Sequence, residues 1–113
     1  MSETIFNRII QREIPADIVY EDELCLAFRD INPQAPVHIL VIPKKPVPKV
    51  VDATTADREL LGHLLETAAR IAKQEGHGED FRLVINNGEK ACQSVFHLHV
   101  HLLAGRIFGW PPG

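Results

Sequence analysis

A stretch of alternating hydrophobic residues and histidines near the carboxyl end constrains the fold of this chain most strongly. Within residues 95–103, His97, His99 and His101 are separated from one another by single hydrophobic residues. Successive side chains of an extended strand point to opposite faces, so the three imidazoles would share one face. The pattern therefore predicts a strand with a histidine face and a purely hydrophobic face that packs on the core.

The histidine face favours a functional site over simple packing. Burying three imidazoles side by side is unfavourable, because each ring carries polar nitrogens that need partners. The alternative is a half-exposed strand whose polar face happens to be histidine. Three of the chain's six histidines stand in this strict alternation, and imidazole is the side chain that exchanges protons near neutral pH. These two facts favour function.

Hydrophobic periodicity predicts two helices elsewhere in the chain. Apolar residues four apart in 4–13 are typical of a short amphipathic helix, which Thr4 or Ser2 would cap. A long apolar stripe predicts a second helix over 57–75, and Gly76 follows it as a stop signal.

Short apolar runs predict four further strands, in 17–21, 24–29, 38–43 and 81–86. The first two runs form a hairpin, and the third is apolar almost throughout, which is typical of a central strand covered on both faces. With the histidine strand, these elements predict an α+β fold. We expect a five-stranded, mostly antiparallel sheet with one long and one short helix, in a single domain spanning residues 1–113.

Such a small sheet has edges to cover, and pairing with a second copy of the chain is one way to cover them. The tail 105–113 carries Phe108 and Trp110, two large apolar residues with no evident place in the core. We expect this tail to lie against the partner of a homodimer.

Charge excludes some partners of the chain. The formal net charge is −3, the pI is near 6.0, and no basic run is longer than Lys44-Lys45. The sequence therefore lacks the basic surface that a nucleic-acid binding protein needs, although a single nucleotide remains a possible ligand.

The two cysteines and the apolar runs suggest a compartment. Cys25 and Cys92 lie far apart and form no CxxC motif, so two reduced thiols are the simpler interpretation. We find no signal-peptide pattern and no apolar run long enough to cross a bilayer. These observations favour a cytoplasmic protein with no membrane partner.

Two chemical mechanisms suit a histidine face. In one, the imidazoles bind a metal such as zinc and activate a water molecule, with His38 or Cys92 as a further ligand. In the other, one imidazole attacks a phosphorus centre directly. Polar groups near the strand, contributed by Asn86, Gln93 and Ser94, would then stabilise the phosphate oxygens. The residues alone leave both mechanisms open.

The run from His97 to Leu103 matches the His-φ-His-φ-His-φ-φ signature (φ hydrophobic) of the histidine triad superfamily. Stretches that resemble its nucleotide-binding branch extend over nearly the whole chain, at 5–10, 13–16, 30–36, 41–45, 93–95 and the closing Trp-Pro-Pro-Gly. The resemblance implies a homodimer in which two five-stranded sheets join. It implies hydrolysis of purine nucleoside phosphoramidates at the P–N bond, which releases the nucleoside monophosphate without a metal or another cofactor.

The resemblance also assigns roles to the histidines by position. His99 would attack the α-phosphorus and form a nucleotidyl-histidine that water then hydrolyses. His101 would contact the phosphate and the leaving group, the backbone of His97 would orient His99, and His38 would join the relay from the neighbouring strand. The substrate-binding residues implied in the same way are Asp30 for the ribose, Phe6, Ile9, Ile14 and Ile31 for the base, Asn86, Cys92, Gln93 and Ser94 at the phosphate, and Trp110 reaching the partner's active site.

One position departs from the pattern of that family. Cys92 stands where glycine is common, and a cysteine there would strain the loop if the residue needs a positive φ. A nucleotide-binding interaction module with incidental catalysis also remains compatible with the sequence, as does the zinc hydrolase.

Overall fold

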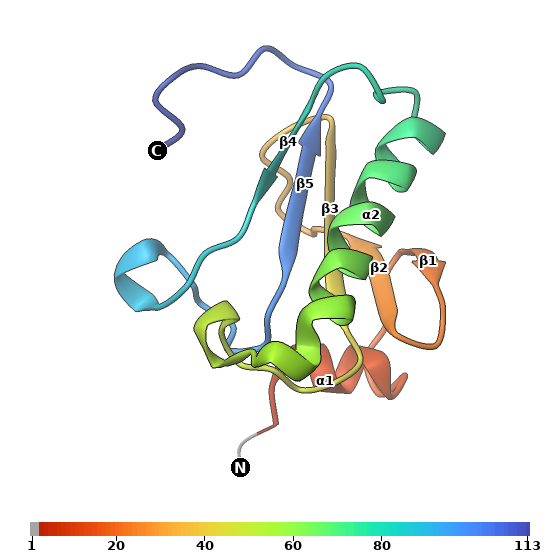
Figure 1. Cartoon of the computed structure of the whole chain (residues 1–113). Coiled ribbons are helices and arrows are strands. Elements are labelled where there is room, and N and C mark those ends of the chain that lie inside the picture. The colour runs from red at the N-terminus through yellow and green to blue at the C-terminus, as the bar shows by residue number, and fades with distance from the viewer. Residues whose placement is uncertain (1–2) are drawn as a thin grey trace.

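The computed structural model describes residues 3–113 and contains one five-stranded antiparallel sheet (Figure 1). The strand order is β1-β2-β3-β5-β4, so β1 and β4 form the edges. The predicted α+β fold with a five-stranded antiparallel sheet, one long helix and one short helix is confirmed. The elements are α1 (Ile5–Ile10), β1 (Ile18–Glu21), β2 (Cys25–Arg29), β3 (Val37–Pro43), α2 (Arg58–Gln74), β4 (Phe81–Val84), β5 (Val100–Ala104) and the 3-10 turns Val50–Asp52, Thr55–Asp57 and Glu89–Ala91.

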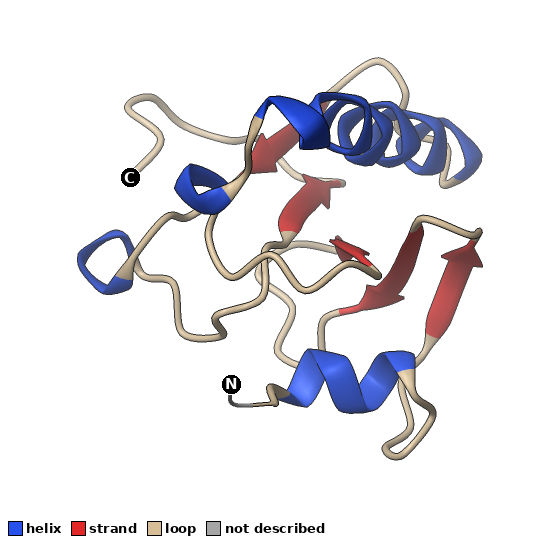
Figure 2. Ribbon diagram, turned by 60° about the horizontal axis from the view of Figure 1, so that its bottom comes forward, coloured by secondary structure: helices blue, strands red, loops and turns tan. Residues whose placement is uncertain are grey.

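The sheet lies between the two helices, with α2 over one face and α1 near the other (Figure 2). All seven residues of β3 are buried, because this strand is central and both of its faces are covered. This arrangement confirms the prediction from its continuous apolar run. The α2 face holds the larger core, which includes Ile39, Val41, Leu64, Ala68, Ile71, Leu98, Val100 and Leu102.

Helix α2 begins and ends close to its predicted limits. Thr54 forms a capping box with Asp57 in the turn that leads into the helix. At the other end Gly76 has φ of +85°, a left-handed conformation that glycine adopts readily. The long helix predicted over 57–75 is therefore confirmed.

Helix α1 is shorter than the predicted 4–13. Thr4 caps it, as expected, whereas Ser2 lies outside the described residues. The helix stops at Ile10 because Arg12 adopts a left-handed φ of 63°. The amides of Arg12 and Glu13 then bond back to the carbonyls of Ile9 and Arg8, the pattern of a Schellman motif with arginine in the usual glycine position.

Strand β5 also starts later than expected. Its ladder with β3 begins at the pair Val41↔Val100, so His97 and His99 precede the regular strand. Pro43 explains the break, because proline has no amide proton to donate to a neighbouring strand. The alternation nevertheless persists, since Leu98 and Val100 are both buried on the α2 face.

The structure also describes the two cysteines and the lengths of the helices. Cys25 is buried, Cys92 is exposed, and neither forms a disulfide. Among residues 3–113, no helix combines the length and the apolar character that a membrane span requires.

Candidate active site

A cleft of about 380 Å³ opens on the α1 face of the sheet. Helix α1 and the segment after it line the cleft together with parts of β2, β3 and β5. Its lining is mostly hydrophobic, and the polar or charged residues in it are Arg29, Asp30, Ser94, His99 and His101. Eight sequence-predicted site residues therefore come together in this cleft: Phe6, Ile9, Ile14, Asp30, Ile31, Ser94, His99 and His101.

Main-chain carbonyls hold the imidazoles of His97 and His99. Nδ1 of His99 lies 2.7 Å from the carbonyl oxygen of His97, and Nε2 of His97 lies 2.7 Å from that of Pro43. A carbonyl oxygen can only accept a hydrogen bond, so these ring nitrogens carry the protons. In neutral His99, Nε2 is therefore left with a lone pair that can act as a nucleophile.

His38 and His101 form a second pair whose protons are equally well placed. The amide of Gln34 donates to Nδ1 of His38 over 3.0 Å, so neutral His38 carries its own proton on Nε2. That proton is donated to Nδ1 of His101, 2.9 Å away, which leaves the proton of His101 on Nε2. The His99 and His101 rings lie beside each other with centroids 4.9 Å apart. One ring thus offers a lone pair and its neighbour offers an N–H.

Burial keeps these four rings neutral at neutral pH. Desolvation lowers the pKa of His38, His97 and His99 below the ordinary value of 6.5, and their hydrogen bonds or the Asp30 charge offset this only in part. Burial, together with the nearby His99 and His38, lowers the pKa of His101 to about 4. The uncharged form that a nucleophilic imidazole requires is therefore the resting state.

Asp30 stands beside the histidines with an acceptor available for a ligand. One carboxylate oxygen accepts from the amide of Asn32 at 2.8 Å, and the other lies 3.5 Å from Nε2 of His38. The side chain is 21% exposed, so its carboxylate can still be reached from the cleft.

The hydrogen bonds of the histidines do not suit a catalytic zinc ion. Donor atoms of Asp30, His38 and His101 lie within 4.8 Å of one another, the spacing of a ligand set. A histidine that binds a metal through one nitrogen donates a proton from the other. Here Nδ1 of His38 accepts from the Gln34 amide, so Nε2 keeps its proton and has no lone pair for a metal.

Comparison with known proteins identifies the family. The model of the HIT domain matches residues 11–107. The chain belongs to the HIT family. A HIT family hydrolase from Legionella pneumophila Philadelphia 1 has the same fold, with a TM-score of 0.96 and 48% identity over 98% of this chain and 100% of that one. An adenylylsulfatase HINT1 from Arabidopsis thaliana is 54% identical over 99% of this chain and 78% of that protein. A 14 kDa zinc-binding protein from Zea mays is 57% identical over 99% of this chain and 89% of that protein.

The side chain of Gln93 holds the loop before the histidines in place through hydrogen bonds to the main chain. Its buried side chain accepts from the amide of Gly88 and donates to the carbonyls of Pro48 and Val95, all within 3.0 Å. Gln93 therefore braces the loop and does not line the cleft. Cys92 has a φ of 73°, so this cysteine does occupy a left-handed conformation.

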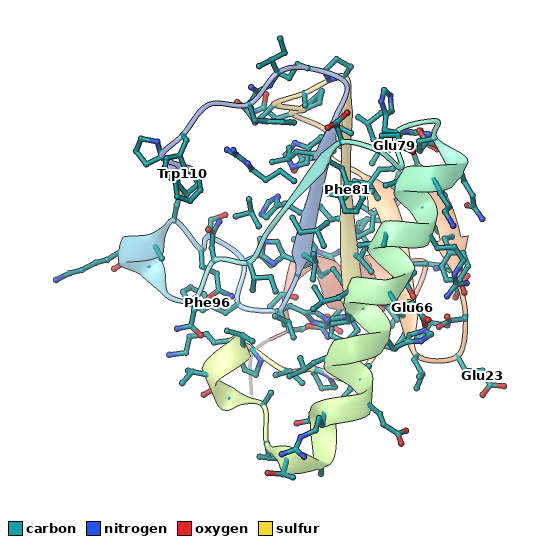
Figure 3. The ribbon with its side chains drawn as sticks, turned by 45° about the horizontal axis from the view of Figure 1, so that its top comes forward. Glu23, Glu66, Glu79, Phe81, Phe96 and Trp110 are labelled. Carbon is teal, nitrogen blue, oxygen red and sulfur yellow. The ribbon has the colours of Figure 1, made fainter. Side chains whose placement is uncertain are left out.

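Three further predicted site residues lie outside the lining of the cleft, namely Asn86, Cys92 and Trp110. The tail places Trp110 on the outer side of the molecule, where the residue is 85% exposed (Figure 3). The guanidinium groups of Arg82 and Arg106 lie 5.1 and 4.3 Å from the Phe108 ring centroid, which fixes the base of the tail.

Two main-chain groups that orient the histidines were missed by the sequence reasoning. They are the amide of Gln34 and the carbonyl of Pro43. Every residue type offers a carbonyl and nearly every one an amide, so no sequence signal could have found them.

A larger cavity of about 740 Å³ lies between the tail and β4. Its lining includes Glu79, Asp80, Arg82 and Arg106. None of the four histidines described above, His38, His97, His99 and His101, belongs to it. The smaller cleft is the candidate active site because it combines a neutral nucleophile with a hydrophobic pocket.

Proposed function

We propose that this HIT protein hydrolyses purine nucleoside phosphoramidates through a covalent nucleotidyl intermediate on His99. One observation supports this mechanism above the others. The hydrogen bond from Nδ1 of His99 to the carbonyl of His97 leaves Nε2 unprotonated, in a neutral ring that lines the cleft. A lone pair in that position can attack a phosphorus atom without prior loss of a proton.

In the first step, Nε2 of His99 bonds to the α-phosphorus while the P–N bond breaks, and the leaving amine takes a proton from solvent. The Nε2–H group of His101 donates to the phosphoryl group, and the hydroxyl of Ser94 offers a second donor at the cleft. In the second step, water attacks the phosphorus, releases its proton and displaces His99. The nucleoside monophosphate leaves and His99 is again neutral.

The rest of the cleft suits a nucleoside. The side chains of Phe6, Ile9, Ile14 and Ile31 offer an apolar surface for a purine ring. Beside them, the Asp30 carboxylate can accept hydrogen bonds from the two ribose hydroxyls. The name of the Arabidopsis relative suggests adenylyl sulfate as a second substrate to test, because attack on the same phosphorus would release sulfate.

The active unit that we propose is a homodimer. Strand β4 is an edge strand, and the neighbouring tail exposes Ile107 and Trp110 almost completely. Contact with a second copy would bury these side chains and could bring Trp110 to the partner's cleft, on the leaving-group side.

The test is hydrolysis of adenosine 5′-phosphoramidate by metal-free protein, with His99→Ala in parallel. We expect wild type to release adenosine monophosphate and the variant to bind the nucleotide without turnover. Equal rates for the two proteins would contradict the nucleophile. Tight binding of adenosine monophosphate without turnover by wild type would favour the nucleotide-binding module instead.

Zinc is the alternative cofactor to consider, since the maize relative is named for zinc binding. The proton on Nε2 of His38 argues against a zinc ion among the cleft histidines. We therefore expect chelator treatment to leave the rate unchanged. Activity that disappears with chelator and returns with zinc would favour the metal mechanism.

A further inference from the structure

A second group of metal-ligating side chains lies away from the cleft, where the β1–β2 hairpin meets α2. Asp22 stands in the hairpin turn, Cys25 begins β2, and His63 belongs to the first half of α2. Figure 3 labels Glu23 in that turn and Glu66 on the adjoining part of α2. The proposed function uses none of the three residues.

The three side chains are close enough to share one ion. One donor atom from each lies within 4.8 Å of the others, and Nε2 of His63 is 2.7 Å from a carboxylate oxygen of Asp22. Carboxylate, imidazole and thiolate are the ligand types that zinc takes in proteins. Cys25 is buried, while the Asp22 and His63 side chains are about a quarter exposed, so an ion could enter from one side.

Surrounding groups already orient the carboxylate. One oxygen of Asp22 accepts from the amides of Leu24 and Cys25 at 2.8 and 2.9 Å, and the other accepts from the hydroxyl of Tyr20 at 2.8 Å. Although burial opposes them, these hydrogen bonds hold the pKa of Asp22 well below its ordinary value. The carboxylate is therefore charged and fixed in place, as the outer partners of metal ligands usually ensure.

Unlike His38, His63 can hold its proton on one ring nitrogen while the other nitrogen binds a metal. Within residues 3–113, Nδ1 of His63 has no hydrogen-bond partner in the protein, so that nitrogen can hold the imidazole proton while Nε2 binds a metal. The thiol of Cys25 lies 4.0 Å from the hydroxyl oxygen of Thr67 and beside the Asp22 carboxylate. Burial and that carboxylate raise the pKa of the thiol to about 11, so the metal has to displace a proton when the sulfur binds.

We propose that Asp22, Cys25 and His63 form a zinc site, with water as the fourth ligand, that ties the β1–β2 hairpin to α2. Binding replaces the hydrogen bond between His63 and Asp22 with two bonds to the ion. The imidazole proton moves to Nδ1, and the thiol proton of Cys25 is released to solvent as the sulfur–zinc bond forms. In the metal-free protein the same residues act as a hydrogen-bonded clamp.

Cobalt(II) added to the full, metal-free chain tests this site. Cobalt bound to a thiolate absorbs through sulfur-to-metal charge transfer, which imidazole and carboxylate ligands do not produce. We expect this band in wild type, saturating at a single ion and disappearing on addition of zinc. His63→Gln should weaken the affinity at least ~100-fold, because losing a ligand costs more than losing its outer partner. Cys25→Ser should abolish the band.

Two matched variants serve as controls. His77→Gln changes the histidine that belongs neither to the group around the cleft nor to the proposed zinc site, and Cys92→Ser removes the only other thiol. Both should keep the band. Its absence from wild type, its loss in Cys92→Ser, or its persistence unchanged in His63→Gln would each overturn the proposal. The His63 side chain is partly exposed on a helix, so we expect His63→Gln to fold even if the buried Cys25→Ser does not. Phosphoramidate turnover is measured separately, and its failure would leave the cobalt result unaffected.

Discussion

The two faces of the sheet are built for different tasks. The α2 face is a continuous apolar core under a helix of seventeen residues. The α1 face is covered only in part by a helix of six residues, and it buries His38, His97 and His99 beside a smaller hydrophobic cluster. Neutral imidazoles can be buried there because each has an identified hydrogen-bond partner. The larger hydrophobic core thus lies on one face of the sheet, and the candidate reactive groups lie on the other.

The sharpest test of this division is His99→Gly on the α1 face. We expect kcat for adenosine 5′-phosphoramidate to fall by roughly 10³-fold or more, since a covalent mechanism has no substitute for its nucleophile. The Kd for adenosine monophosphate should change little, and turnover is compared per folded molecule because truncating the buried His99 also lowers stability. A loss of nucleotide binding equal to the loss of turnover would mean that His99 supports the cleft structurally.

The opposite result is expected from Leu64→Ala on the α2 face. Leu64 is 1% exposed, and its truncation should lower the free energy of unfolding by about 3 kcal/mol through lost burial and a cavity. Urea unfolding measures the stability, and turnover per folded molecule should stay near wild type. A large fall in kcat of the folded protein would show that the two faces are coupled.

Acid should destabilise the α1 face specifically. The pKa values of the buried histidines are lowered in the folded state. Between pH 6.5 and about 4, the unfolded chain therefore binds protons that the native state does not bind. The free energy of unfolding should therefore decrease as the pH is lowered, by about 1.4 kcal/mol per pH unit for each such proton. Urea titrations at several pH values measure the slope. His101→Gln should reduce it, and an unchanged slope would contradict the assignment.

Replacing Asp30 in the cleft should have a smaller effect, on KM, that depends on the substrate. Asp30→Ala should raise KM roughly 10- to 100-fold, the value of hydrogen bonds to a charged group. A phosphoramidate of 2′,3′-dideoxyadenosine lacks the ribose hydroxyls, so its KM should be the same for both proteins. An equal loss for the two substrates would indicate that Asp30 acts through His38, 3.5 Å away.

Patterns that repeat along the chain predicted most of this architecture. The stripe on α2, the apolar run of β3 and the alternation around His99 each report which face is buried, because periodicity follows directly from backbone geometry. Element ends were less predictable. Helix α1 stops where Arg12 adopts a conformation usual for glycine, and the β5 ladder is broken opposite Pro43.

The candidate side chains and the carbonyl of His97 were predicted, but two other main-chain groups that orient the histidines were missed. The three alternating histidines were evident from residue type, and Asp30 came from the family resemblance alone, whereas the amide of Gln34 that sets the His38 tautomer has no sequence signal. Gln93 was predicted to contact the phosphate because it follows a glycine-containing turn just before the histidines. Its burial and its three internal hydrogen bonds depend on Pro48, which is distant in sequence.

The smallest predicted effect concerns Cys92, the left-handed residue in the loop before the histidines. Cys92→Gly should raise the free energy of unfolding by about 1 kcal/mol, because a non-glycine side chain is strained at a φ of 73°. Gly88→Ala is the matched control: its φ is 97° and no atom within 4 Å would meet the added Cβ, so any loss of stability reports backbone strain alone. Urea midpoints should shift in opposite directions for the two variants. If Cys92→Gly is neutral or destabilising while Gly88→Ala destabilises, the thiol contributes contacts that outweigh the strain.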